Sequence, residues 1–189
     1  MQKGVHLITI LLLCFVVIHS CKNSTTVNQP TQTPEKTTLN TWVKPSSYIQ
    51  GVPIYDTFSD IEPLFHLDTD TTYFINFWAT WCKPCVEELP YFEAFTEQYK
   101  NQKVKVILVS LDFPKKIETK LIPFLEKHQL KSEVVVLKDG KFNNWIDKVS
   151  PKWDGSIPVT YIYKGNQTHF ISGSIDNQKD LENAYLGMK

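Results

Sequence analysis

Apolar runs alternate with amphipathic stretches between residues 72 and 111. Residues 72–78 form a nearly continuous apolar and aromatic run, which is typical of a strand buried on both faces. Residues 82–100 carry apolar side chains at helical spacing, and Pro90 predicts a kink because the apolar stripe continues beyond it. Residues 104–111, rich in Val, Ile and Leu, predict another strand. The pattern therefore predicts strand, helix and strand in succession.

The same alternation continues to the end of the chain. The further predicted elements are a lead-in strand within 48–66 and a short helix after Ser59 or Asp60, a helix over 114–129 with a kink or boundary at Pro123, a strand over 133–137, a short helix over 141–149, strands over 158–164 and 167–172, and a helix over 175–186 that starts near Ser174 or Asn177. Alternating strands and helices predict an α/β fold. Its central mixed sheet has parallel pairs, an antiparallel edge hairpin and helices on both faces.

The first 20 residues predict a secretory signal peptide. Lys3 gives a positively charged start, and Leu7–Ile18 is apolar except for Thr9. A membrane span takes about 20 residues, so this run is too short to span and suits the core of a signal peptide. The residues Ile18-His19-Ser20-Cys21 resemble the lipobox of bacterial lipoproteins, which implies cleavage before Cys21 and lipidation of that cysteine. Ordinary cleavage with Cys21 left free stays open.

A polar tract follows Cys21. Residues 22–47 are rich in Thr, Asn, Gln, Pro and Ser, so they bury too little apolar surface to offset the entropy of ordering. We expect a flexible tether over 21–47, with a reach of roughly 25–30 Å, and a folded domain over 48–189. The protein is then held at a membrane by its lipid anchor, on the periplasmic side of the cell envelope.

Composition narrows the classes of function. Hydrophobic residues make up 42% of the chain, enough for a packed core, and the 20 basic residues balance 20 acidic ones. No long basic run is present, which disfavours nucleic-acid binding. All basic residues are Lys, so bidentate guanidinium clamps are not available.

The cysteine positions indicate redox chemistry. Cys14 lies in the predicted signal peptide and Cys21 at the predicted lipidation site, which leaves Cys82 and Cys85 as thiols. They stand where a buried strand gives way to a helix. The free N–H groups and partial positive charge of the helix N-terminus stabilise a thiolate on Cys82 and lower its pKa, and Lys83 adds a positive charge. Cys85 is expected to be less exposed.

The segment Asn76-Phe77-Trp78-Ala79-Thr80-Trp81-Cys82-Lys83-Pro84-Cys85, with Glu88-Leu89-Pro90 and Ile157-Pro158, resembles one family. It resembles the thioredoxin-fold thiol-disulfide oxidoreductases, and within them the membrane-anchored TlpA/ResA-like group. The resemblance covers roughly residues 50–187. It implies a thioredoxin-like fold and a catalytic pair, Cys82 and Cys85, in which Cys82 attacks and Cys85 resolves. No cofactor is implied.

The resemblance also singles out Asn76 and Glu88. Thioredoxins have a buried Asp where this chain has Asn76, whereas the TlpA/ResA-like group has Asn there and an acid three residues after the second cysteine. Glu88 lies one helical turn after Cys85, where partial burial would raise its pKa and allow it to take the Cys85 proton. The alternative is a surface Glu that only favours the helix dipole. Glu87 is expected to be solvated.

Substrate contacts are expected around the cysteine pair. The resemblance implies a cis bond at Ile157-Pro158 beside the cysteines, with the backbone of Ile157 offered to an extended substrate strand. Trp81, Lys83 and Pro84 are the other predicted substrate-binding residues. Trp81 is expected to be exposed and Trp153 to line a docking surface, while Trp145 fits the core better.

The implied partners are a disulfide-containing or thiol-containing protein substrate and a membrane electron-donor protein, with reduction of the substrate as the implied direction. A metal-binding or metallochaperone module is the alternative function, because paired thiolates bind soft ions. It is disfavoured since no His lies near the pair in sequence. A peroxiredoxin-like peroxidase is disfavoured by the lack of Arg. A purely structural adaptor is disfavoured because both cysteines and the acid are present.

Overall fold

The computed structural model describes residues 43–189, which fold around a mixed sheet. Its strands are β1 (Ser47–Ile49), β2 (Val52–Tyr55), β3 (Thr72–Trp78), β4 (Val104–Ser110), β5 (Glu133–Leu137), β6 (Val159–Lys164) and β7 (Gln167–Ser172). They are arranged in the order β1-β2-β5-β4-β3-β6-β7. Neighbours among β2, β5, β4 and β3 are parallel, and the remaining pairs are antiparallel. The predicted parallel pairs and antiparallel edge hairpin are confirmed.

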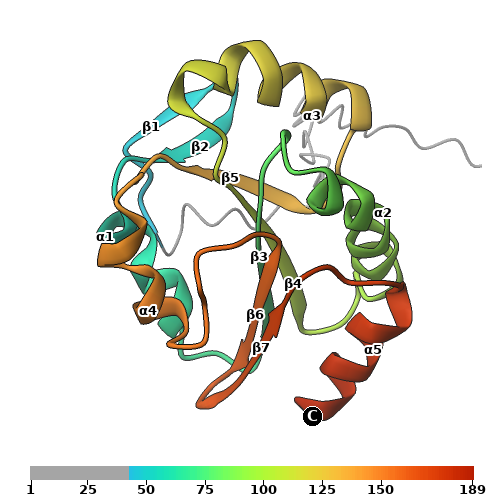
Figure 1. Cartoon of the computed structure of the whole chain (residues 1–189). Helices are drawn as coiled ribbons and strands as arrows, with labels where there is room; N and C mark the ends of the chain where they lie inside the picture. Colours follow the sequence, from blue (N-terminus) through green and yellow to red (C-terminus); the bar gives the residue numbers. More distant parts are fainter. Residues whose placement is uncertain (1–42) are drawn as a thin grey trace, which may run out of the picture. The chain divides into compact units, whose positions relative to one another are not determined.

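Helical segments cover both faces of the sheet. They are α1 (Phe58–Ile61), η2 (Glu62–His66), α2 (Lys83–Gln98), η3 (Pro114–Lys116), η4 (Ile117–Leu121), α3 (Ile122–His128), η5 (Phe142–Asn144), α4 (Ile146–Val149) and α5 (Gln178–Gly187). Figure 1 shows α1 and α4 on one side of the sheet and α2 and α5 on the other. The predicted thioredoxin-like arrangement, a sheet with helices on both faces, is present.

The strand β3 contributes side chains to two hydrophobic cores, one on each face of the sheet, and all of its residues are buried, as predicted. Its odd-numbered residues, such as Phe77, pack with α1 and α4, and Phe74 and Trp78 pack with α2, α3 and α5. This division follows from the strand's period of two. Trp145 belongs to the first core, as expected, with 2% of its surface exposed. Each fully buried large side chain contributes about 1.5–3 kcal/mol.

The region predicted as one helix over 114–129 consists of three helical segments. The 3-10 turn η3 leads into the wide π-helical η4, and α3 begins only at Ile122, with Pro123 in its first turn. Proline has no N–H to donate to the preceding turn, and its ring crowds the carbonyl four residues back. The predicted boundary at Pro123 is therefore confirmed, and the continuous helix is wrong.

Two predicted helix starts need correction. The helix α1 begins at Phe58 rather than after Ser59, because Thr57 and Asp60 form a capping box around its N-terminus. The last helix, α5, begins at Gln178 with Asn177 as its N-cap, so the predicted start near Asn177 is confirmed and the start at residue 175 is not. Ile175 instead precedes the helix, where it is buried and its N–H donates to Glu88 of α2.

The packed structure includes residues upstream of β1. Val43 is buried, and its carbonyl accepts a hydrogen bond from the Tyr55 hydroxyl at 3.0 Å. The N–H of Ser46 donates to the carbonyl of Ile54 at 2.8 Å. The predicted signal peptide, Cys21 and the tether up to residue 42 lie outside the described residues. Among residues 43–189 no helix combines the length and apolar character needed to span a bilayer.

Candidate active site

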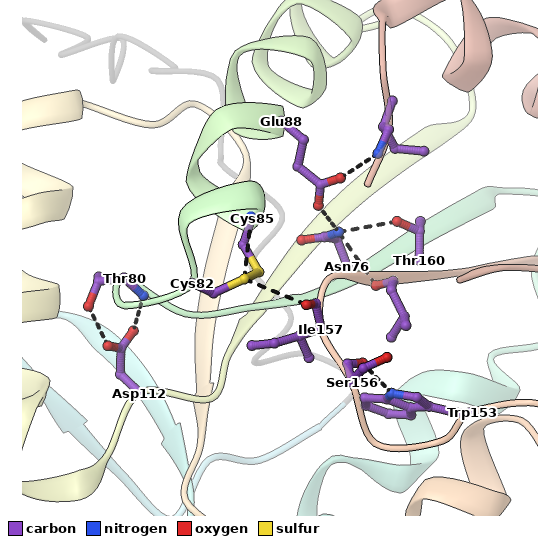
Figure 2. Close-up of a disulfide and its surroundings, with 12 residues drawn as sticks. Asn76, Thr80, Cys82, Cys85, Glu88, Asp112, Trp153, Ser156, Ile157 and Thr160 are labelled. Atoms are coloured by element: carbon purple, nitrogen blue, oxygen red, sulfur yellow. Dashed lines mark hydrogen bonds between the residues drawn. A yellow bond between two sulfur atoms is a disulfide. The ribbon is translucent and has the colours of Figure 1, made fainter. Parts of the chain in front are cut away.

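The two cysteines lie at the start of α2, a few residues after the end of the buried strand β3. Cys82 is the N-cap of α2, and its Sγ accepts a hydrogen bond from the backbone N–H of Cys85 at 3.3 Å. The two residues form a disulfide, drawn in Figure 2. Cys85 is fully buried, whereas Cys82 keeps 6% of its surface exposed. The predicted order of accessibility is confirmed, because the cysteine at the helix terminus is the more exposed of the two.

The loop between β3 and Cys82 is held by Asp112, just beyond β4. The buried Asp112 carboxylate accepts hydrogen bonds from the N–H of Thr80 at 3.0 Å and from the hydroxyl of Ser110 at 2.9 Å. The Thr80 hydroxyl donates to the same carboxylate (Figure 2). The sequence analysis missed Asp112. Its signal was an acid directly after a parallel strand, at the sheet edge where the ends of such strands converge.

Glu88 is a buried carboxylate, not a surface one. Only 1% of its surface is exposed. Its Oε1 accepts from Asn76 Nδ2 at 2.8 Å, and its Oε2 accepts from the N–H of Ile175 at 2.7 Å (Figure 2). Burial raises the pKa of Glu88 to about 7, although both hydrogen bonds favour the ionised form. Glu88 is therefore able to exchange a proton near neutral pH, and the surface alternative is wrong.

Ile157 and Pro158 lie beside the disulfide, as the resemblance implies, and the peptide bond between them is cis. The carbonyl oxygen of Ile157 is 3.7 Å from Cys82 Sγ. Trp153 is hydrogen-bonded to the residue before this segment, since its Nε1 donates to the carbonyl of Ser156 at 2.7 Å. Because Trp153 packs against Phe77 and is only 3% exposed, its predicted place on a docking surface is wrong.

An exposed aromatic pair lies near the cysteine pair: Trp81 directly precedes Cys82, and Phe113 is brought to it by the fold. Trp81 is 54% exposed, as predicted, and stacks on Phe113 with ring centroids 5.6 Å apart. Both residues line a cavity of about 350 Å³, together with Phe142 and Ile157. The sequence analysis missed Phe113 and Phe142. Phe113 follows β4, and Phe142 follows β5 as the first residue of η5, at the sheet edge that also carries the cysteines.

Lys83 and Pro84 project from the first turn of α2 into solvent. The Lys83 side chain is 86% exposed, and its Nζ is 3.6 Å from a carboxylate oxygen of Glu87, which is itself 64% exposed. Glu87 is thus solvated, as predicted. Water and Glu87 both screen the charge of Lys83, so the helix terminus is the main local source of positive potential at Cys82.

Metal binding, the alternative function, would need a cluster of ligands around the cysteine pair. Within residues 43–189 no group of three or more His, Cys, Asp or Glu side chains is placed to hold a metal ion. The two cysteines are bonded to each other.

Comparison with known proteins gives a family for most of the folded part. The model described as the AhpC/TSA family matches residues 64–168. The protein named thiol-disulfide oxidoreductase ResA from Oceanobacillus iheyensis is 35% identical over 94 residues, which make up 49% of this chain and 43% of that protein. ResA from Geobacillus thermodenitrificans is 32% identical over 125 residues, 64% of this chain and 67% of that protein. This chain therefore spans less than half of the first relative.

Solved structures agree on the fold. A thioredoxin-related protein from Neisseria meningitidis serogroup B has a TM-score of 0.55 at 22% identity, over 64% of this chain and 86% of that one. A thiol:disulfide interchange protein of the thioredoxin family from Chlorobium tepidum has a TM-score of 0.51 at 18% identity, over 63% and 80% of the two chains. At these identities the likeness speaks for the thioredoxin-like fold alone.

Proposed function

Since the chain belongs to the AhpC/TSA family, and its relatives include proteins named thiol-disulfide oxidoreductase, we propose that it is a thiol-disulfide oxidoreductase acting on protein disulfides. One observation carries the proposal. The Cys82–Cys85 disulfide lies at the N-terminus of α2, with the more exposed cysteine at the helix end. A thiolate there is stabilised by the N–H groups and the dipole of the helix, and it is the reactive form in disulfide exchange.

The reductive half-reaction begins from the dithiol. The Cys82 thiolate attacks one sulfur of the substrate disulfide, so a mixed disulfide forms and the other substrate sulfur leaves as a thiolate and takes up a proton. The Cys85 thiol then passes its proton to Glu88 and attacks the sulfur of Cys82. The second substrate sulfur leaves, the Cys82–Cys85 disulfide closes, and the substrate has gained two electrons. A membrane electron-donor protein with its own dithiol then reduces the Cys82–Cys85 disulfide, and its dithiol is oxidised to a disulfide.

The surroundings of Cys82 suit an extended polypeptide substrate. The carbonyl of Ile157 is 3.7 Å from Cys82 Sγ, so a strand bound along Ile157 would bring its own cystine to the attacking sulfur. On the other side, Trp81 and Phe113 offer apolar surface above a cavity of about 350 Å³. In this proposal the exposed residues Lys83 and Pro84 also contact the substrate. Backbone contacts and apolar stacking favour a protein partner over a small polar disulfide.

The proposal predicts unequal thiols. In the reduced protein the pKa of Cys82 should lie well below about 8.5, the value of an unperturbed thiol, because it caps α2, whereas the pKa of the fully buried Cys85 should not. Labelling with iodoacetamide across a pH series, followed by peptide mass spectrometry, gives one midpoint for each cysteine. Equal midpoints would overturn the assignment of Cys82 as the attacking residue.

The place of action is part of the proposal. The lipobox-like residues Ser20-Cys21 support lipidation of Cys21, and hence a membrane-anchored protein on the periplasmic side of the envelope. Cys21→Ala should block processing or move the protein from the membrane fraction to the soluble fraction, with exchange activity retained. Ser24→Ala, three residues further along the chain, is the control and should fractionate normally. Membrane association of Cys21→Ala equal to that of the unmutated chain would refute the anchor.

A further inference from the structure

One buried acceptor next to the cysteine pair has no hydrogen-bond partner. Among the described residues, the buried side-chain nitrogen and oxygen atoms without a partner are Asn76 Oδ1 and Trp78 Nε1. Asn76 is fully buried on the face of β3 that packs against α2. Leaving such an acceptor without a donor is unfavourable, because it loses its hydrogen bonds to water and gains none in return. The oxidised site therefore carries a polar group that lacks a donor.

The orientation of the Asn76 amide is fixed by its nitrogen. Nδ2 donates to Glu88 Oε1 at 2.8 Å and to Thr160 Oγ1 at 3.1 Å, and it lies 3.4 Å from the carbonyl oxygen of Val159. A backbone carbonyl only accepts, so the nitrogen must face Val159 whether Glu88 is ionised or protonated. The oxygen must then point the other way. Figure 2 shows it directed toward the side where the disulfide lies.

We propose that Asn76 is a positioning residue whose Oδ1 accepts a hydrogen bond from the Cys85 thiol in the reduced protein and so favours the dithiol over the disulfide. The Cys85 sulfur has no hydrogen to donate while it is bonded to Cys82. Reduction supplies an S–H group on the residue one helical turn before Glu88, whose carboxylate is already bound to Asn76. The unpartnered acceptor thus gains a donor only in the reduced state. This inference rests on the proposed redox role of the pair.

The other unpartnered atom does not compete for this role. Trp78 lies two residues along β3, and its ring packs against Phe124 of α3 at a centroid distance of 5.5 Å. The indole N–H is present in both redox states, so it cannot supply Asn76 Oδ1 with a donor in the reduced state alone. The S–H group of Cys85 can, because it exists in one state alone.

Equilibration with glutathione measures the effect. Reduction of the pair converts two glutathione thiols to one glutathione disulfide, breaks the Cys82–Cys85 bond and gives each cysteine one proton. Asn76→Ala should lower the equilibrium constant for this reduction about tenfold, equivalent to a potential more negative by about 30 mV. A purely structural role would weaken both redox states alike and leave the constant unchanged. An unchanged or raised constant would overturn the proposal.

Two further variants separate the oxygen of Asn76 from its nitrogen. Thr160→Val removes one acceptor from Nδ2 but leaves Oδ1 in place, so its constant should stay within about twofold of the unmutated protein. The tenfold shift should persist when Asn76→Ala is made in a Glu88→Gln background. Loss of the shift there would mean that the effect runs through Glu88, and would overturn the role of Oδ1.

Infrared spectroscopy of the reduced, unmutated protein provides a test that needs no folded Asn76 variant. The S–H stretching band of Cys85, identified by its loss in Cys85→Ser, should be shifted to lower frequency than that of the same thiol in the unfolded chain. A band at the position of a thiol without a hydrogen bond would contradict the proposal. Neither measurement uses a protein substrate, so a failure here is distinguishable from a failure of exchange activity.

Discussion

Glu88→Gln is expected to slow the resolution of a mixed disulfide by roughly 10²-fold, the low end for general acid–base catalysis. Burial holds the pKa of Glu88 at about 7, where the carboxylate can take the proton from the Cys85 thiol. Gln keeps the size of the side chain but cannot accept that proton. The first attack by Cys82 should change far less, because its activation rests on the N-terminus of α2. Stopped-flow measurements on a preformed mixed disulfide separate the two steps.

The role of Glu88 also predicts how the rate of resolution changes with pH. Only ionised Glu88 can accept a proton, so resolution in the unmutated protein should accelerate as pH rises through about 7, the pKa of Glu88. This acceleration should be absent in Glu88→Gln. Glu87→Gln is the matched control. Glu87 is exposed, and the salt bridge that it forms within the described residues is with Lys83. Equal behaviour of the two variants would reduce Glu88 to a structural acid.

The hydrogen bonds of the Glu88 carboxylate indicate that Glu88→Gln should also change the stability of the fold. Both carboxylate oxygens of Glu88 accept from N–H groups, one on Asn76 and one on Ile175. A Gln side chain offers one oxygen and one NH₂ group, so one of the two contacts is lost or shared. Urea unfolding of the oxidised variant measures this cost separately. A kinetic effect that merely tracked the loss of stability would appear in both exchange steps rather than in resolution alone.

The elements that carry strong local patterns were predictable. The run over β3 is apolar on both faces, and the stripe through α2 continues across Pro90, so strand, helix and the position of Cys82 between them followed from the residues. For Glu88 the local pattern was weaker: the resemblance singled it out, and its spacing from Cys85 indicated partial burial while a surface position stayed open. Its burial in the structure decides between the two.

What the sequence did not show depends on contacts between distant segments. The N–H of Ile175 reaches Glu88 across 87 positions of sequence, and no local pattern marks a backbone donor. Asp112 holds Thr80 only because β3 and β4 are neighbours in the sheet. The burial of Trp153 follows from the packing of Phe77 against it. Composition and periodicity do not predict these contacts or this burial, because they are set by tertiary packing.

A trapping experiment should show all-or-none dependence on Cys82. Without Cys85 the mixed disulfide cannot be resolved, so the reduced Cys85→Ala protein, given a model peptide pair joined by one disulfide, should accumulate an adduct. The adduct should carry one peptide on Cys82. The unmutated protein should show almost none, because Cys85 expels the peptide. Fully buried Cys85 should not substitute for Cys82 in the Cys82→Ala variant.

Mass spectrometry of these adducts tests the exchange mechanism most directly. Three reduced chains are compared: Cys85→Ala, Cys82→Ala, and the double variant that lacks both and controls for peptide bound at Cys21. A stable adduct on Cys82 is expected in Cys85→Ala alone. No adduct in Cys85→Ala, or equal adduct formation in Cys82→Ala, would contradict the claim that this protein exchanges disulfides by attack from Cys82 at the N-terminus of α2.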